Sequence, residues 1–183
     1  MKEIRMILLL VAMVGVIDSC TKTETKTVTS AATTNGIFLA GAAGQSKSWT
    51  LASITQSKNG GTAVAGTGIP TCESDNIFKF SNSSLQSYQS SEGNSTCTST
   101  DPATIESGNW AFTDDGKTLL IEGTINVTSD EVFGTDHDIM YFLLFTYFGP
   151  LNVVKISDTS LTLTYTYTSG TDTYLMTIVL QKV

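Results

Sequence analysis

Apolar and polar residues alternate along several short stretches of the chain, which is typical of half-buried β-strands. The clearest stretch is LTLTYTYT (161–168), where leucines and tyrosines share one face and threonines the other. A strand of this kind has one dry and one wet face. Similar alternation occurs in SWTLASIT (48–55), NIFKF (76–80) and TYLMTIVLQKV (173–183).

The stretch NWAFTDDGKTLLIEG (109–123) predicts a β-hairpin. Trp110 and Phe112 form one face of its first strand, and Leu119 and Ile121 resume that face after the turn. Asp115-Gly116 suits a tight primed turn, the type that matches the twist of paired strands.

The spacing of these elements predicts an all-β fold class. Short strands about ten residues apart, joined by Gly, Asn, Asp and Ser, indicate an antiparallel meander. About eight strands in about 150 residues fit either a closed barrel or a sandwich. Closure into a barrel removes the exposed strand edges that promote aggregation.

One segment, Ile139–Phe148, is apolar on every face and fits neither pattern. Its aromatic content favours a strand, whereas Asp136 before it and Gly149-Pro150 after it are typical of a helix. We expect either a buried part of the core, such as a plug, or a segment that lines or gates an apolar pocket.

The N-terminus resembles an export signal. Lys2 and Arg5 precede an apolar run that ends at Ile17, which is shorter than the roughly 20 residues that a membrane-spanning helix needs. Ile17 and Ser19 before Cys20 are similar to a bacterial lipoprotein signal, which predicts a signal peptide over residues 1–19 and acylation of Cys20. A plain secretory signal and an uncleaved membrane tail are the alternatives.

Residues 20–35 contain almost no large apolar side chain, so we expect a lipidated cysteine followed by a flexible, threonine-rich tether. The folded domain would then span residues 36–183. Lipidation of Cys20 leaves Cys72 and Cys97, an even pair in an oxidising compartment, which predicts a disulfide. A metal-binding cysteine pair is the alternative, but the close Cys/His spacing of such sites is missing.

Composition and charge exclude several functions. The net charge of −7 and the absence of a basic run make nucleic acid an unsuitable partner. The single histidine, His137, lies between two aspartates and is expected in a solvated loop. Carboxylates such as Glu106 and Glu122 fall in turn-like or exposed positions. The sequence thus predicts no catalytic residues, no metal site, no cofactor and no enzymatic activity.

Several motifs together resemble the lipocalin-like lipoproteins common in Bacteroidota. The resemblance covers roughly residues 38–183, apart from about 126–150. It comprises a tryptophan-led strand, a cysteine followed by Asp-Asn and an aromatic strand, a second cysteine, a Gly-x-Trp-x-Phe strand and a terminal strand pair. The matching residues are Trp49, Cys72, Asp75, Asn76, Phe78, Phe80, Cys97, Gly108, Trp110, Phe112 and Leu161.

The resemblance implies an antiparallel up-and-down β-barrel of about eight strands, with Trp49 and Trp110 packed at its closed end. It also implies a cavity for one small apolar or amphipathic ligand. The inward aromatic residues that would line it are Phe78, Phe80, Trp110, Phe112, Tyr165 and Tyr167. The alternative is a filled barrel that acts as a structural or interaction module through its surface and the loops 56–75, 83–108 and 126–138.

These expectations together place the protein in the cell envelope, anchored to a membrane by acyl chains on Cys20. The outer membrane is the expected location, on its periplasmic or its surface side.

Overall fold

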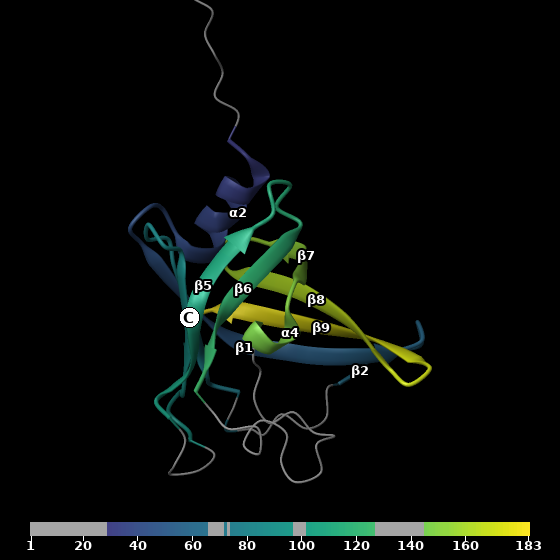
Figure 1. Cartoon of the computed structure of the whole chain (residues 1–183). Coiled ribbons are helices and arrows are strands. Elements are labelled where there is room, and N and C mark those ends of the chain that lie inside the picture. Colours follow the sequence, from purple (N-terminus) through teal and green to yellow (C-terminus); the bar gives the residue numbers. More distant parts are fainter. Residues whose placement is uncertain (1–28, 66–71, 73, 97–101, 127–144) are drawn as a thin grey trace, which may run out of the picture.

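The computed structural model describes residues 29–65, 72, 74–96, 102–126 and 145–183. In this part of the chain nine strands form one antiparallel sheet, in which β3 to β9 pair in chain order and β1 lies between β2 and β3. Pairing of the first strand with the last closes eight of them into a barrel (Figure 1). The strands are β1 (Ser46–Lys58), β2 (Val64–Ala65), β3 (Ile77–Ser81), β4 (Ser87–Ser91), β5 (Thr104–Phe112), β6 (Thr118–Ile125), β7 (Leu151–Ile156), β8 (Ser160–Ser169) and β9 (Asp172–Lys182).

The predicted fold class is confirmed, and the barrel replaces the sandwich alternative. The short strand β2 pairs only with β1 and lies outside the closed set. Between Leu51 and Ser53 the pairing of β1 with β9 shifts by a β-bulge. The bulge changes the phase of the alternation. Leu51 and Ile54 therefore both pack against the core, although they are three residues apart.

The strand pairing in the barrel is shortest between β6 and β7. Only Thr118 with Asn152 and Leu119 with Leu151 pair there, although β6 continues to Ile125. The short helix α4 (Phe145–Phe148) contacts β6 on this side and leads into β7 (Figure 1).

Helix α2 (Ala31–Ala40) covers one end of the barrel (Figure 1). The hydroxyl of Ser30 caps its N-terminus by accepting from the N–H of Thr33. Its last turn is buried against the indole of Trp49, whose Nε1 donates to the carbonyl of Leu39 at 2.9 Å. The ring of Trp110 packs against the backbone of Gly36. The two tryptophans thus lie at the closed end, as the resemblance implied.

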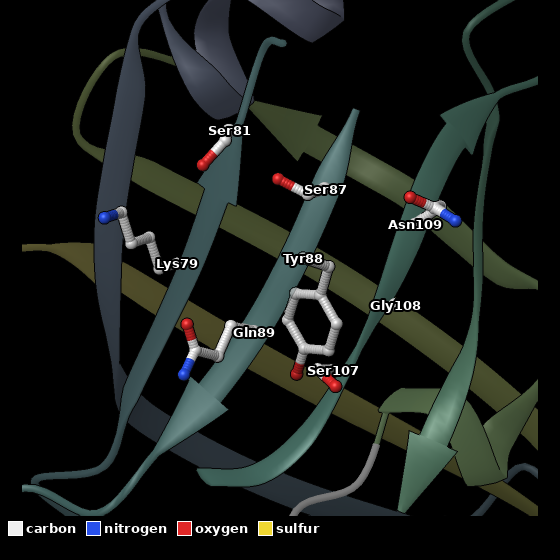
Figure 2. A pocket seen from close by; sticks show the side chains of 8 residues that line it. All are labelled: Lys79, Ser81, Ser87, Tyr88, Gln89, Ser107, Gly108 and Asn109. Carbon is white, nitrogen blue, oxygen red and sulfur yellow. The ribbon is translucent and has the colours of Figure 1, made fainter. Parts of the chain in front are cut away.

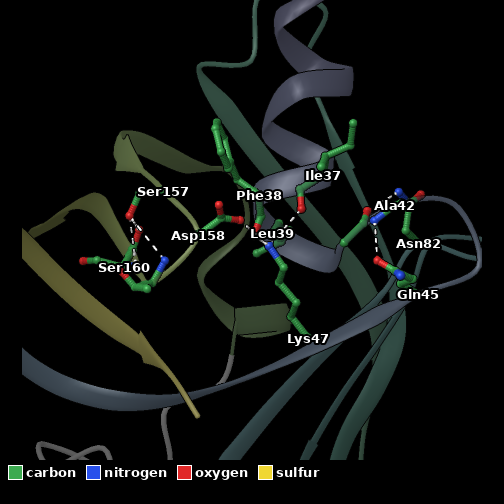
Figure 3. Close-up of polar contacts among 12 residues, drawn as sticks. Ile37, Phe38, Leu39, Ala42, Gln45, Lys47, Asn82, Ser157, Asp158 and Ser160 are labelled. Carbon is green, nitrogen blue, oxygen red and sulfur yellow. Dashed lines mark hydrogen bonds and ion pairs between the residues drawn. The ribbon is translucent and has the colours of Figure 1, made fainter.

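A charged network fixes the C-terminal end of α2 to the barrel (Figure 3). Lys47 Nζ donates to the carbonyls of Ile37 and Phe38 at 3.1 and 2.8 Å, and pairs with Asp158 at 2.9 Å. A cation at this position favours the helix because the last carbonyls carry partial negative charge. The Lys47 hydrogen bond, followed by its charge, lowers the pKa of Asp158.

Helix α2 corrects the expected boundary between tether and domain. Residues 31–35 were assigned to the flexible tether, yet they are helical, and Asn35 Nδ2 donates to the carbonyl of Gly116 at 2.9 Å. The folded unit therefore starts near Ser30. Residues 1–28, including Cys20, lie outside the described residues. No helix within the described ranges is long and apolar enough to span a membrane.

Two further local predictions were wrong. The β5–β6 connection is longer than a two-residue primed turn, because Thr113 pairs with Thr118 and the N–H of Gly116 bonds back to the carbonyl of Thr113. Gly116 has φ +69°, whereas Asp115 keeps an ordinary negative φ. The range 83–108, expected as a loop, contains β4 and half of β5.

Candidate functional site in the barrel interior

Four of the six predicted lining residues form one aromatic group inside the barrel. Phe80 contacts Trp110 edge-on at 6.5 Å between ring centroids, and Trp110 contacts Phe112 at 5.9 Å. Phe78 lies in the same core, and Phe112 is partly buried against it. Alternation along β3 and β5 points these rings inward, as the sequence predicted.

The other two, Tyr165 and Tyr167, form a second group on the inner face of β8. Their rings stack at 6.0 Å, and Tyr167 stacks on Tyr174 of β9 at 5.1 Å. Gln56 Nε2 donates to the Tyr167 hydroxyl at 2.6 Å, and Lys58 Nζ lies 5.9 Å from the centre of the Tyr174 ring. This group is only partly buried. It therefore forms a wetter region of the inner wall.

Helix α4 joins the two aromatic groups. Phe145 is fully buried, with its ring 5.0 Å from that of Phe78, whereas Phe148 contacts Tyr165 at 5.3 Å. The predicted apolar segment 139–148 thus ends in a helix that serves as a plug; its residues 139–144 lie outside the described residues. The space between the two groups is filled by α4 rather than by the barrel strands.

A buried carboxylate holds α4 in place. Glu106 of β5 has no solvent exposure. Its Oε1 accepts hydrogen bonds from the Tyr88 hydroxyl and from the N–H of Phe145 at 3.0 Å, and its Oε2 accepts from the N–H of Thr146 at 3.0 Å. These three donors offset the cost of burying the charge, and α4 supplies two of them.

The pairing also shapes the electrostatics of Tyr88. Burial, followed by the negative charge of Glu106, raises the pKa of the Tyr88 hydroxyl well above its ordinary value. The phenol therefore stays neutral and can donate to the carboxylate. Beside this pair lies Ser90, which faces Glu106 across β4 and β5; its buried hydroxyl lies near the Tyr88 hydroxyl and slightly opposes the rise in the Tyr88 pKa.

Sequence reasoning missed Tyr88, Ser90 and the position of Glu106. Glu106 was expected at an exposed or turn-like position, but it is a buried strand residue. The signal was present, because Glu106 lies four residues before Trp110 and alternation places both on one face. The serine-rich stretch SYQSS (87–91) concealed β4, since only Tyr88 in it is apolar.

A separate depression of about 440 Å³ lies on the outer face of β3, β4 and β5 (Figure 2). Its rim is polar and exposes one cation, Lys79, beside Gln89 and Asn109. The side chains of these three residues alternate with the inward rings of the same strands, so the depression lies on the opposite face of the sheet from the barrel interior. Tyr88, whose ring is buried in the core, also borders it.

The remaining predicted site residues are only partly visible. Cys72 is described and is partly buried, whereas Cys97, Cys20 and His137 lie outside the described residues. The disulfide and the lipidation stay predictions. Within the ranges that the structure describes, no three His, Cys, Asp or Glu side chains gather in a metal-binding cluster.

No protein-family model matches the chain, and no curated protein is significantly similar to it.

Proposed function

We propose that the protein is an exported lipoprotein whose barrel binds one small apolar or amphipathic ligand. Acyl chains on Cys20 hold it at a membrane of the cell envelope, with the outer membrane as its expected location. In this proposal the chain belongs with the lipocalin-like lipoproteins that its motifs resemble, and it acts as a binding protein and not as an enzyme.

The observation that carries the proposal is the way the interior is filled. Phe145 and Phe148 insert between two aromatic groups of the barrel wall, yet they belong to a four-residue helix outside the sheet. An aromatic wall filled by a separable element is suited to exchange that element for a ligand, since apolar pockets with few polar groups are typical binding sites.

Native mass spectrometry tests the proposal. The protein is extracted from its own membrane and cleaved at a protease site inserted within residues 21–28, which leaves α2 intact. Cleavage removes the anchor, so any added mass on the folded part is cargo. A stoichiometric adduct that is lost on denaturation supports the proposal. A bare domain, also after loading with a fluorescent apolar probe, contradicts it.

The outer depression supports the second candidate, a filled barrel that acts as an interaction module. Its polar rim, with Gln89, Asn109 and Lys79, suits adaptable hydrogen bonding to a partner surface. For this candidate, the parent protein should carry no cargo, and the substitution Lys79→Glu should abolish co-purification of an envelope partner. Cargo on the parent protein, together with co-purification that Lys79→Glu does not change, would favour the binding barrel.

A further inference from the structure

Helix α4 fills a polar position as well as an apolar one. The N–H groups of Phe145 and Thr146 bond to the Glu106 carboxylate, while the Phe145 ring packs on Phe78 and Tyr88. Helix α4 therefore offers the barrel interior two N–H donors, for Glu106, and an adjoining apolar ring, for Phe78 and Tyr88. A molecule that replaces α4 must supply equivalent groups.

The donors are the critical part of this requirement. With α4 removed, Glu106 keeps the hydrogen bond from Tyr88 to Oε1, but Oε2 loses its only described donor, Thr146. A buried carboxylate oxygen without a partner is strongly unfavourable. The hydroxyl of Ser90, on the neighbouring strand and beside the Tyr88 hydroxyl, has an oxygen that can serve as a further acceptor.

We infer that Glu106, Tyr88 and Ser90 form a head-group subsite, and that its ligand is an amphiphile with a primary ammonium head and an apolar tail. The inference rests on the proposed ligand-binding function. An ammonium group has three donors, which matches the two carboxylate oxygens and the Ser90 hydroxyl. Its hydrogen bonds to a carboxylate are charge-assisted and stronger than those from a neutral N–H.

The same subsite discriminates against fatty acids. A carboxylate head beside Glu106 would place two like charges in a buried site, so one of them would have to take up a proton. A neutral alcohol can donate only one hydrogen bond, which satisfies Oε2 but brings no positive charge to the carboxylate and leaves the Ser90 hydroxyl unused. The subsite thus ranks head groups as ammonium, then hydroxyl, then carboxylate.

The connection of α4 to the barrel permits it to leave. Gly149, directly after α4, has φ +73° and open space where a side chain would lie. Glycine tolerates large backbone changes at such a position. Leu151 two residues later is fixed in the core, so Gly149 marks the boundary between the plug and the sheet.

Isothermal titration calorimetry tests the ranking on the exported chain with Cys20→Ala, a change outside the described residues. Dodecylammonium and dodecanoate are titrated below their micelle concentrations, and dodecanol below its solubility limit, at pH 7. We expect dodecylammonium to bind at least tenfold tighter than dodecanoate. Equal or reversed affinities overturn the head-group inference and leave the proposed function standing. If none of the three binds, both fail.

Two variants separate the subsite from the overall negative charge of the protein. Glu106→Gln should reduce the preference to threefold or less, whereas Glu122→Gln, which removes an exposed carboxylate from β6, should preserve it. An equal loss in both variants overturns the inference. If Glu106→Gln does not fold, Ser90→Ala replaces it, with an expected three- to tenfold loss for dodecylammonium and none for dodecanol.

Hydrogen exchange tests the displacement itself. The amides of Phe145 and Thr146 should exchange at least tenfold faster when dodecylammonium is bound, because they lose their bonds to Glu106. Unchanged or slower exchange in the bound state would show that α4 stays in place, which overturns the inference.

Discussion

Gly108 faces Gly123 directly across β5 and β6, and neither position has room for a side chain. A Cβ on Gly108 would lie 2.0 Å from the carbonyl oxygen of Glu122, and one on Gly123 would lie 2.1 Å from that of Ser107. Glycine within a strand often marks such a close approach of two backbones. The two glycines let β5 and β6 approach closely at Gly108, which lies two residues along β5 from Glu106.

Replacement of Gly108 by alanine should separate these strands. Because the clash is with backbone atoms, no side chain can move aside, and we expect a loss of about 2 kcal/mol or more in the free energy of unfolding. Urea denaturation measures it. Asn109→Ala, at the exposed neighbouring position, is the matched control and should change stability by less than about 0.5 kcal/mol. Equal stabilities of the two variants would contradict the close approach.

The bond between Trp49 and Leu39 gives a second prediction. Trp49→Phe removes the Nε1 donor and leaves the buried carbonyl of Leu39 unsatisfied, which should cost about 1–3 kcal/mol. Hydrogen exchange should become faster in α2 before it does so in the strands, because the helix loses an anchor. Val154→Ala, on the exposed face of β7, is the control and should leave α2 protected. Unchanged exchange in α2 after Trp49→Phe would show that this bond does not anchor it.

Alternation predicted those strands whose inward residues are large. Phe78 and Phe80 in β3, and Leu161 and Leu163 in β8, are apolar at every second position, and both strands are present. In β4 the inward residues are Tyr88 and Ser90, so the hydrophobic signal is weak and the sequence predicts a loop there. A strand whose inner face is partly polar cannot be separated from a loop by alternation alone.

The polar part of the site depends on contacts between residues far apart in the chain. Glu106 is buried with its charge because Tyr88 and α4 bring donors to it, and no local pattern encodes that meeting. Helix α2 was missed for a related reason. Its apolar side chains gather in Ile37–Ala40 and do not recur at helical spacing, so the sequence gives no amphipathic signal. Its stability comes from docking on Trp49 and Trp110.

Tyr88 should titrate abnormally. Burial and the Glu106 charge raise its pKa, so the neutral phenol is favoured in the folded state. Its contribution to stability is complete below the ordinary value of 10.0 and is lost as the pH rises towards the raised value. Absorbance at the phenolate band should show one tyrosine that ionises only as the barrel unfolds. In Tyr88→Phe this late component should be missing; if it persists, another tyrosine is responsible.

The ion pair of Lys58 with Asp172 links β1 to the β8–β9 hairpin at 2.6 Å. The hydrogen bond from Lys58, followed by that from Asn59, lowers the pKa of Asp172, and the pair raises that of Lys58. The stabilisation is therefore present between the ordinary values of 3.8 and 10.5. It is lost as the pH falls through the lowered pKa of Asp172, or rises through the raised pKa of Lys58.

Asp172→Asn tests this window. The variant should be slightly less stable than the parent protein at pH 7, and the difference should vanish in strong acid and shrink in 1 M salt, because exposed pairs are screened. Urea denaturation across the pH range measures both effects. A difference that persists unchanged in strong acid would assign the effect to the hydrogen bond with Asn59 instead of to charge.

The register of β3 and β4 is compatible with the predicted bridge between Cys72 and Cys97. Ile77 pairs with Ser91, so Cys72 precedes and Cys97 follows the same end of this strand pair. Asp75 strengthens that end, since its Oδ2 accepts from the N–H groups of Asn94 and Ser95 at 2.8 and 3.1 Å. Asp75, three residues after Cys72, is thus held to Asn94 and Ser95, which precede Cys97 in the chain.

Removal of the bridge should destabilise the barrel without changing its fold. Closing a loop of about 25 residues should contribute roughly 3 kcal/mol, mainly by restricting the unfolded chain. Cys72→Ser and the double variant with Cys97→Ser should therefore lose similar amounts in urea denaturation, whereas Cys20→Ser should lose none. Alkylation of the exported, denatured protein counts the thiols, and two reactive thiols from Cys72 and Cys97 before reduction would contradict the bridge. A bridge that is present but adds no stability would contradict the expected restriction of the unfolded chain.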